Sequence, residues 1–114
     1  MSKIAISCAA PTDSLLAATI LHEEIGYSFS SARDRIKKGK KGFFFTTELY
    51  LNDHVEKERV IRTLIKRFNS IGVELFIAEI GYLESWADID NIDTARIPSE
   101  DLIAELDLSD GKFR

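Results

Sequence analysis

The chain opens with a segment in which apolar and polar side chains alternate. Over residues 3–8, Ile4 and Ile6 fall on the face opposite Ser7. A period of two is typical of a β-strand, because successive side chains point to opposite faces of a sheet. Pro11 follows and interrupts the pattern, so we expect the first strand to span residues 3–8.

Three later stretches carry apolar residues at the three- and four-residue spacing of an amphipathic helix. Thr12 or Asp13 is placed to cap the first helix and Asp53 to cap the third, and each of the three is followed by a glycine. We expect helices over residues 15–25, from residue 28 or 29 to residue 38, and between Asp53 and Gly72.

Two further segments are rich in β-branched and aromatic residues and predict strands, over residues 43–51 and 73–80. Alternation places Phe44 on the face opposite Phe43 and Phe45. The predicted order is β-α-α-β-α-β. With the helices on one face of a small sheet, this order predicts an α+β fold, a two-layer sandwich.

After Gly81 the pattern becomes irregular, with single apolar residues between acids. We expect this segment to pack Trp86 against the preceding domain, because a lone tryptophan usually has a packing role. Pro98 and Ser99 then open a short helix. The sequence thus predicts an α+β domain over residues 1–81 and an acidic C-terminal extension over residues 82–114 that packs on it.

Composition is that of one globular domain: 114 residues, with 45% apolar and 30% charged residues. The single cysteine cannot form an internal disulfide, and the apolar start is too short for a signal peptide or a membrane span. We therefore expect a cytoplasmic protein. The net charge of −4 is uneven, because residues 1–83 carry +2 and residues 84–114 carry −6.

Several residues along the second predicted helix match a known family. After Gly26 the chain carries Ala32, Arg33, Asp34 and Ile36, and the third helix is followed by a glycine and a short alternating strand at residues 72–75. This pattern resembles the C-terminal domain of the bacterial ribosomal stalk protein, a fold shared by the adaptor of the Clp protease. The resemblance covers about residues 3–80 and implies the fold.

The resemblance does not carry either family's activity to this chain. The stalk domain recruits translation factors through lysines on its first two helices, and only Arg33 and Lys37 match that chemistry here. The asparagine-aspartate signature of the Clp adaptor is missing after the first strand, where the chain reads Ala9-Ala10-Pro11-Thr12.

The sequence gives little support for catalysis. His22 has Glu23 and Glu24 beside it, but adjacent helical positions diverge by about 100°, so one face would hold only part of a metal site. His54 stands alone, and Cys8 lies in a predicted buried strand without a neighbouring base. We expect no enzyme activity, no cofactor and no metal site.

Two charged features are candidate binding surfaces. The first is a glycine-flanked turn that could contact phosphate, because glycines let backbone approach phosphates and lysines neutralise them. Its alternative interpretation is a solvated turn at a helix end. The candidate phosphate-binding residues are Lys37, Lys38, Lys40 and Lys41.

The second feature is the acidic extension, where acids alternate with apolar anchors, a mixture that suits a protein interface. The candidate partner-binding residues are Asp88, Asp90, Asp93, Glu100, Asp101 and Glu105. We expect a non-catalytic, macromolecule-binding protein of the bacterial immunity or antitoxin type, which would neutralise a basic nuclease toxin through this acidic surface. The alternative is a nucleic-acid or ribosome-associated protein that uses the lysine turn.

Overall fold

The computed structural model describes residues 2–49 and 53–109. Three antiparallel strands form one sheet in the order β2-β1-β3, with β1 (Ser2–Cys8) between β2 (Phe45–Glu48) and β3 (Leu75–Gly81). The register pairs Ile6 with Phe45 on one side and with Ile77 on the other. The α+β prediction is confirmed, and the three predicted strand segments belong to one sheet.

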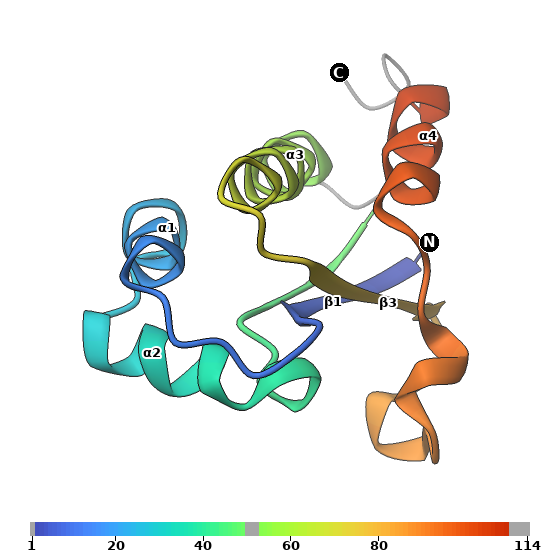
Figure 1. Cartoon of the computed structure of the whole chain (residues 1–114). Helices are drawn as coiled ribbons and strands as arrows, with labels where there is room; N and C mark the ends of the chain where they lie inside the picture. Colours follow the sequence, from blue (N-terminus) through green and yellow to red (C-terminus); the bar gives the residue numbers. More distant parts are fainter. Residues whose placement is uncertain (1, 50–52, 110–114) are drawn as a thin grey trace.

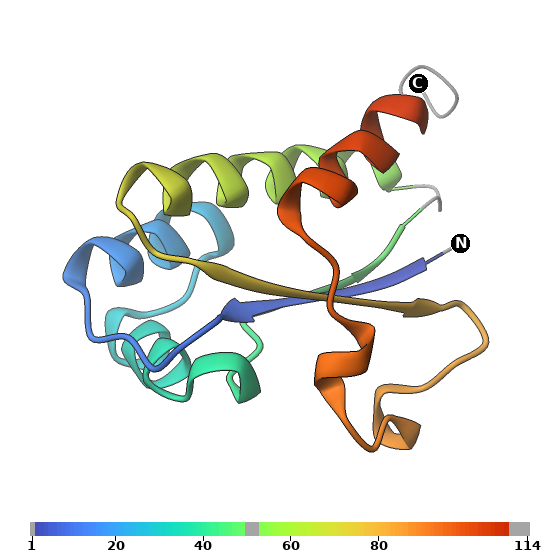
Figure 2. The same ribbon diagram turned by 45° about the vertical axis from the view of Figure 1, so that its right-hand side comes forward.

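The helices cover one side and one end of this sheet. The helices α1 (Leu15–Ile25) and α3 (His54–Ser70) lie over the sheet in Figures 1 and 2, and α2 (Phe29–Lys37) crosses its end near the tip of β1. Between sheet and helices lies the core, in which Leu21, Leu64 and Phe68 are fully buried. The predicted helices therefore bury most of the apolar residues that predicted them, although Leu15 and Leu16 at the start of α1 are exposed.

Helix α1 begins at the predicted residue, but neither predicted residue, Thr12 or Asp13, is its N-cap. Ser14 is its N-cap, and the Ser14 hydroxyl accepts a hydrogen bond from the Ala17 amide at 3.2 Å. Asp13 instead forms an ion pair with Arg33 on α2, and the Thr12 hydroxyl donates to the Ala10 carbonyl. Either residue could cap a helix by its chemistry, so tertiary contacts decide which one does.

Strand β2 is shorter than the predicted segment 43–51, of which residues 50 and 51 lie outside the described residues. Residues 43 and 44 are not in the strand, so strict alternation does not hold there. Phe44 and Phe45 consequently both reach the main core, where the Phe44 ring stacks on Phe68 with centroids 5.6 Å apart. Phe43 points elsewhere and its ring lies 6.0 Å from that of Trp86.

The second face of the sheet is covered by residues 82–97, which we call the strap. The strap contains two short 3₁₀ helices, η2 (Trp86–Asp88) and η3 (Ile92–Ala95), and runs below the sheet in Figure 2. At its end the Ile97 amide donates to the Ile77 carbonyl at 2.9 Å, and Arg96 forms a β-bridge with Ala78. The strap thus closes the outer edge of β3. Trp86 is partly rather than fully buried in it.

The chain then returns to the helical side as α4 (Ser99–Ser109), which lies beside α3 in Figures 1 and 2. Leu102 and Leu106 of α4 are fully buried and belong to the same core as the strands and the other helices. A short helix at this place was predicted from Pro98 and Ser99. Whether residues 1–81 and 82–114 are separate units stays a prediction, although the two share this core.

Candidate binding groove and the charged surfaces beside it

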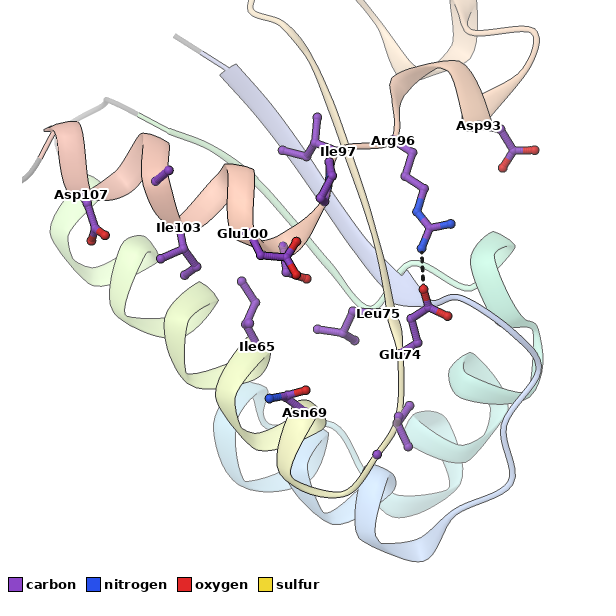
Figure 3. Close-up of a pocket in the computed structure, with 15 residues that line it drawn as sticks. Ile65, Asn69, Glu74, Leu75, Asp93, Arg96, Ile97, Glu100, Ile103 and Asp107 are labelled. Carbon is purple, nitrogen blue, oxygen red and sulfur yellow. Dashed lines mark hydrogen bonds and ion pairs between the residues drawn. The ribbon is translucent and has the colours of Figure 1, made fainter.

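An open groove of about 1060 Å³ lies between α3, the start of β3 and α4. Its apolar lining includes Ile65 of α3, Val73 and Leu75 before and at the start of β3, Ile97 at the end of the strap, and Ile103 of α4 (Figure 3). All but Leu75 are only partly buried. The groove therefore presents apolar surface to solvent, as surfaces that bind other molecules commonly do.

Carboxylates surround this apolar lining. Those that line the groove are Glu74, Asp93, Glu100 and Asp107, and Arg96 is the single cation among the described residues that line it. Three of the four carboxylates take part in ion pairs: Glu74 with Arg96 at 2.9 Å, Asp93 with Lys40 at 2.8 Å, and Asp107 with Arg62 at 2.8 Å. No ion pair to Glu100 is found within the described part of the chain.

The six acids predicted to bind a partner are divided by the fold. Asp93 and Glu100 line the groove, whereas Asp88 and Asp90 are exposed residues of the strap. Asp101 is exposed in the first turn of α4, where a negative charge also stabilises the helix through its dipole. Glu105 is partly buried on α4. The acidic extension thus supplies two surfaces, one on each side of the sheet.

The lysine turn has a structural explanation for its glycines. Gly39 has a positive φ of 64° and is packed so closely that an added Cβ would lie 2.9 Å from Cδ of Pro11. At Gly42 an added Cβ would overlap the Arg35 carbonyl oxygen. Close packing against the chain itself therefore requires both glycines, without any need for a phosphate at this turn.

The four lysines of this turn have different surroundings. Lys40 is paired with Asp93 and Lys38 with Asp34, the latter at 3.3 Å, while Lys37 and Lys41 are exposed. The Lys40 backbone carbonyl also accepts a hydrogen bond from the buried Ser7 hydroxyl at 2.9 Å. The structure thus brings Lys40 and Asp93, one member of each predicted binding surface, into direct contact.

Two of the groups considered for catalysis, Cys8 and His22, make contacts within the fold. Burial raises the pKa of the Cys8 thiol, because desolvation disfavours the thiolate that a nucleophile needs. His22 stacks on Phe29 with ring centroids 4.6 Å apart, and its Nδ1 lies 2.7 Å from the Tyr27 carbonyl oxygen. Within residues 2–49 and 53–109, no three His, Cys, Asp or Glu side chains lie close enough to hold a metal ion.

Sequence reasoning missed most of the groove. Glu74 was not singled out as a binding residue, nor were the apolar Ile65 and Ile103. One signal was available: Arg96 is the only Lys or Arg between residues 84 and 109, and it forms the ion pair and the β-bridge that seat the end of the strap. An isolated cation in an acidic segment is a reasonable candidate for such a fixed contact.

No known protein family, no curated protein and no solved structure matches this chain. The resemblance to the ribosomal stalk domain therefore stays a prediction. In the described part of the chain, none of the helices has the length and apolar character needed to cross a membrane.

Proposed function

We propose that this chain is a non-catalytic protein-binding domain, of the bacterial immunity or antitoxin type, that neutralises a basic toxin domain in the cytoplasm. The observation that carries the proposal is the groove beside α4, which combines a partly exposed apolar lining with carboxylates around it. Apolar anchors supply affinity. Four carboxylates and one cation line the groove, and this excess of negative charge would steer a basic partner and select against acidic ones.

The carboxylates outside the groove add to the same field. Asp88 and Asp90 on the strap and Asp101 on α4 are exposed, and no ion pair to them is found among the described residues. Charges of this kind raise the rate at which a basic partner associates, and their effect falls with ionic strength. A nuclease toxin, which must bind a polyanion, has the complementary charge.

The test compares two triple charge reversals. Asp88, Asp90 and Asp101 are changed to lysine in one variant, and Lys37, Lys38 and Lys41 to glutamate in the other. Asp93 and Lys40 are left unchanged in both, because their ion pair holds the strap to the lysine turn. The partner is captured from the native host with the wild-type protein, purified, and titrated against each variant by calorimetry.

A basic partner whose affinity falls by about 10- to 100-fold in the aspartate variant, and by less than about 3-fold in the lysine variant, supports the proposal. Inhibition of the partner's nuclease activity by the wild-type protein completes it. A larger loss of affinity in the lysine variant than in the aspartate variant contradicts the proposal. If the wild-type protein binds RNA and the lysine variant does not, the protein instead binds nucleic acid through Lys37, Lys38 and Lys41.

A further inference from the structure

Helix α4 presents two stripes of side chains to two different environments. Leu102 and Leu106, one turn apart, are buried in the core. The residues that line the groove are Glu100, Ile103, Ala104 and Asp107. They follow the i, i+3, i+4, i+7 spacing of a single helical face. An amphipathic surface helix needs only one such core-facing stripe. The exposed part of the second stripe, which includes Glu100 and Ala104, can therefore serve a contact outside the domain.

The facing wall of the groove is also helical. Ile65 and Asn69 of α3 line it one turn apart, and in Figure 3 they and Ile103 project into the space between the two helices. Side chains at this spacing form ridges, and the ridges of a third helix pack between them. Ala104, exposed on the α4 stripe, is small enough to let another backbone approach.

A strand is a poor occupant for this groove. Strand addition requires an open edge, and the strap already occupies the outer edge of β3 at Ile77 and Ala78, which leaves only the first residues of β3 for a partner strand. A helix satisfies its own backbone and needs no edge. The geometry therefore favours a helical partner segment over an extended one.

The charges of the α4 stripe define the partner further. Glu100 and Asp107 lie at the two ends of the stripe, seven residues apart, which is about 10 Å along a helix. Asp107 already accepts from Arg62 through Oδ1, but its side chain is 63% exposed and can contact a second cation. Apolar Ile103 lies between them. A helix that fits would carry apolar residues one turn apart, flanked by a Lys or Arg on each side about two turns apart. A second copy of α4 does not fit, because it would set carboxylates against carboxylates.

We propose that the groove between α3 and α4 binds one basic, amphipathic α-helix of the partner protein, with its apolar stripe on Ile65 and Ile103 and its cations at Glu100 and Asp107. This inference rests on the proposed function, since it names the element of the basic partner that the groove receives. It places the contact with the helix on the helical side of the sheet, while the exposed carboxylates of the strap attract the basic partner at longer range.

The probe is a blocked, alanine-based helical peptide of about 16 residues, long enough to be partly helical in water. It carries leucines one turn apart, flanked by arginines two turns apart. A control peptide has the same residues except for two central prolines, which prevent the helix. Each is titrated into isotopically labelled protein, and binding is followed by changes in backbone amide NMR signals.

We expect saturable binding of the helical peptide with signal changes centred on Ile65, Asn69, Ile103 and Ala104, and at least about 10-fold weaker binding of the proline peptide. Ala104→Trp fills the groove and Ile103→Gln removes an anchor, so each should weaken binding about 10-fold or more. Leu108→Gln is the matched control, because Leu108 is exposed on the same helix and does not line the groove. It should leave binding unchanged.

Equal binding of the proline peptide, signal changes centred elsewhere, no binding at millimolar peptide, or unaltered binding by both groove variants would each overturn the inference. The native partner separates this outcome from failure of the proposed function. If the aspartate variant loses a basic partner while Ile103→Gln and Ala104→Trp bind it fully, the proposed function is retained. The inference of a helix bound in the groove is then contradicted. If the peptide binds in the groove but no basic partner is found in the host, the helix-binding groove is retained and the proposed function is contradicted.

Discussion

Lys40 Nζ lies 2.8 Å from both carboxylate oxygens of Asp93, although the two residues are 53 positions apart in the chain. Each belongs to one of the two charged surfaces that the sequence presents as competing binding sites. Their contact joins the lysine turn to the strap, so a change in charge on one side alters the other. The two surfaces are therefore a coupled pair, and variants that reverse either residue disturb both.

The Lys40–Asp93 ion pair should stabilise the fold only modestly. Both side chains are more than a third exposed, and exposed pairs contribute about 0.2–1 kcal/mol. We expect a double-mutant cycle of Lys40→Ala and Asp93→Asn, measured by urea unfolding, to give a coupling free energy in that range. The coupling should decrease in high salt. Lys41→Ala, at an exposed lysine in the same turn, is the control; a cycle between Lys41 and Asp93 should show no coupling.

Truncation of the core side of α4 should be costly. Leu102 and Leu106 are fully buried, and a buried Leu→Ala change usually costs about 2–5 kcal/mol. We expect Leu102→Ala and Leu106→Ala each to lower the free energy of unfolding by an amount in that range. Leu108→Ala, at a side chain that is 80% exposed, should change it by less than about 0.5 kcal/mol. Wild-type stability in both core variants would show that the extension contributes nothing to the fold.

The two kinds of glycine should respond differently to alanine. At Gly42 a Cβ would overlap the Arg35 carbonyl, so we expect Gly42→Ala to lower the free energy of unfolding by about 1–3 kcal/mol. Gly26 has open space around it and a φ of 91°, so Gly26→Ala should cost about 1–2 kcal/mol through backbone conformation alone. A Gly42→Ala variant that keeps full stability but loses affinity for a polyanion would instead identify the turn as a phosphate site.

The Cys8 thiol should make stability fall at alkaline pH. Burial raises its pKa, and a hydrogen bond with Thr12 offsets part of the shift. The unfolded thiol loses its proton near pH 8.5 while the folded one keeps it. The contribution of Cys8 is therefore complete below that pH and is lost as the pH rises toward the folded pKa. We expect the urea midpoint to drop between pH 7.5 and about 9.5 by more in the wild type than in Cys8→Ala.

The same burial protects Cys8 from reagents, which gives an independent check. A thiol reagent at pH 8 should modify the native protein slowly and the urea-unfolded protein at once. Rapid modification of the folded chain would mean that the strand end opens readily or that the thiol is reactive.

Local sequence patterns predicted most helices and strands, because the formation of each depends mainly on the residues within it. Helix α1 occurs at the predicted residues 15–25, since an apolar stripe and a following glycine specify both its face and its end. Strand β2 begins at Phe45 rather than at the predicted residue 43, and three residues separate it from the end of the 3₁₀ turn at residues 39–41. The alternation of apolar and polar residues does not reveal this turn, because the geometry of the turn depends on the packing of Gly39 against Pro11.

The groove could not be predicted because it depends on where the strap crosses the sheet. Asp93 and Glu100 were predicted from charge alone, and they line one groove only because the chain passes from the lower face to the helical side between them. Glu74 and Asp107 are 33 residues apart in the chain and line the same groove only because of that path. Periodicity along α4 did contain the second stripe, at residues 100, 103, 104 and 107, but its meaning required knowledge of which face was buried.

The bridge between Arg96 and Ala78 also bears on how this protein behaves when crowded. Strand β3 reads LFIAEIG, and a strand this apolar with an open edge is a template for intermolecular β-pairing. The end of the strap occupies that edge, and the opposite edge of the sheet is the four-residue β2, which carries Thr46, Thr47 and Glu48. A chain that lost the strap would expose β3 and form fibrillar aggregates at concentrations at which the intact chain stays dispersed.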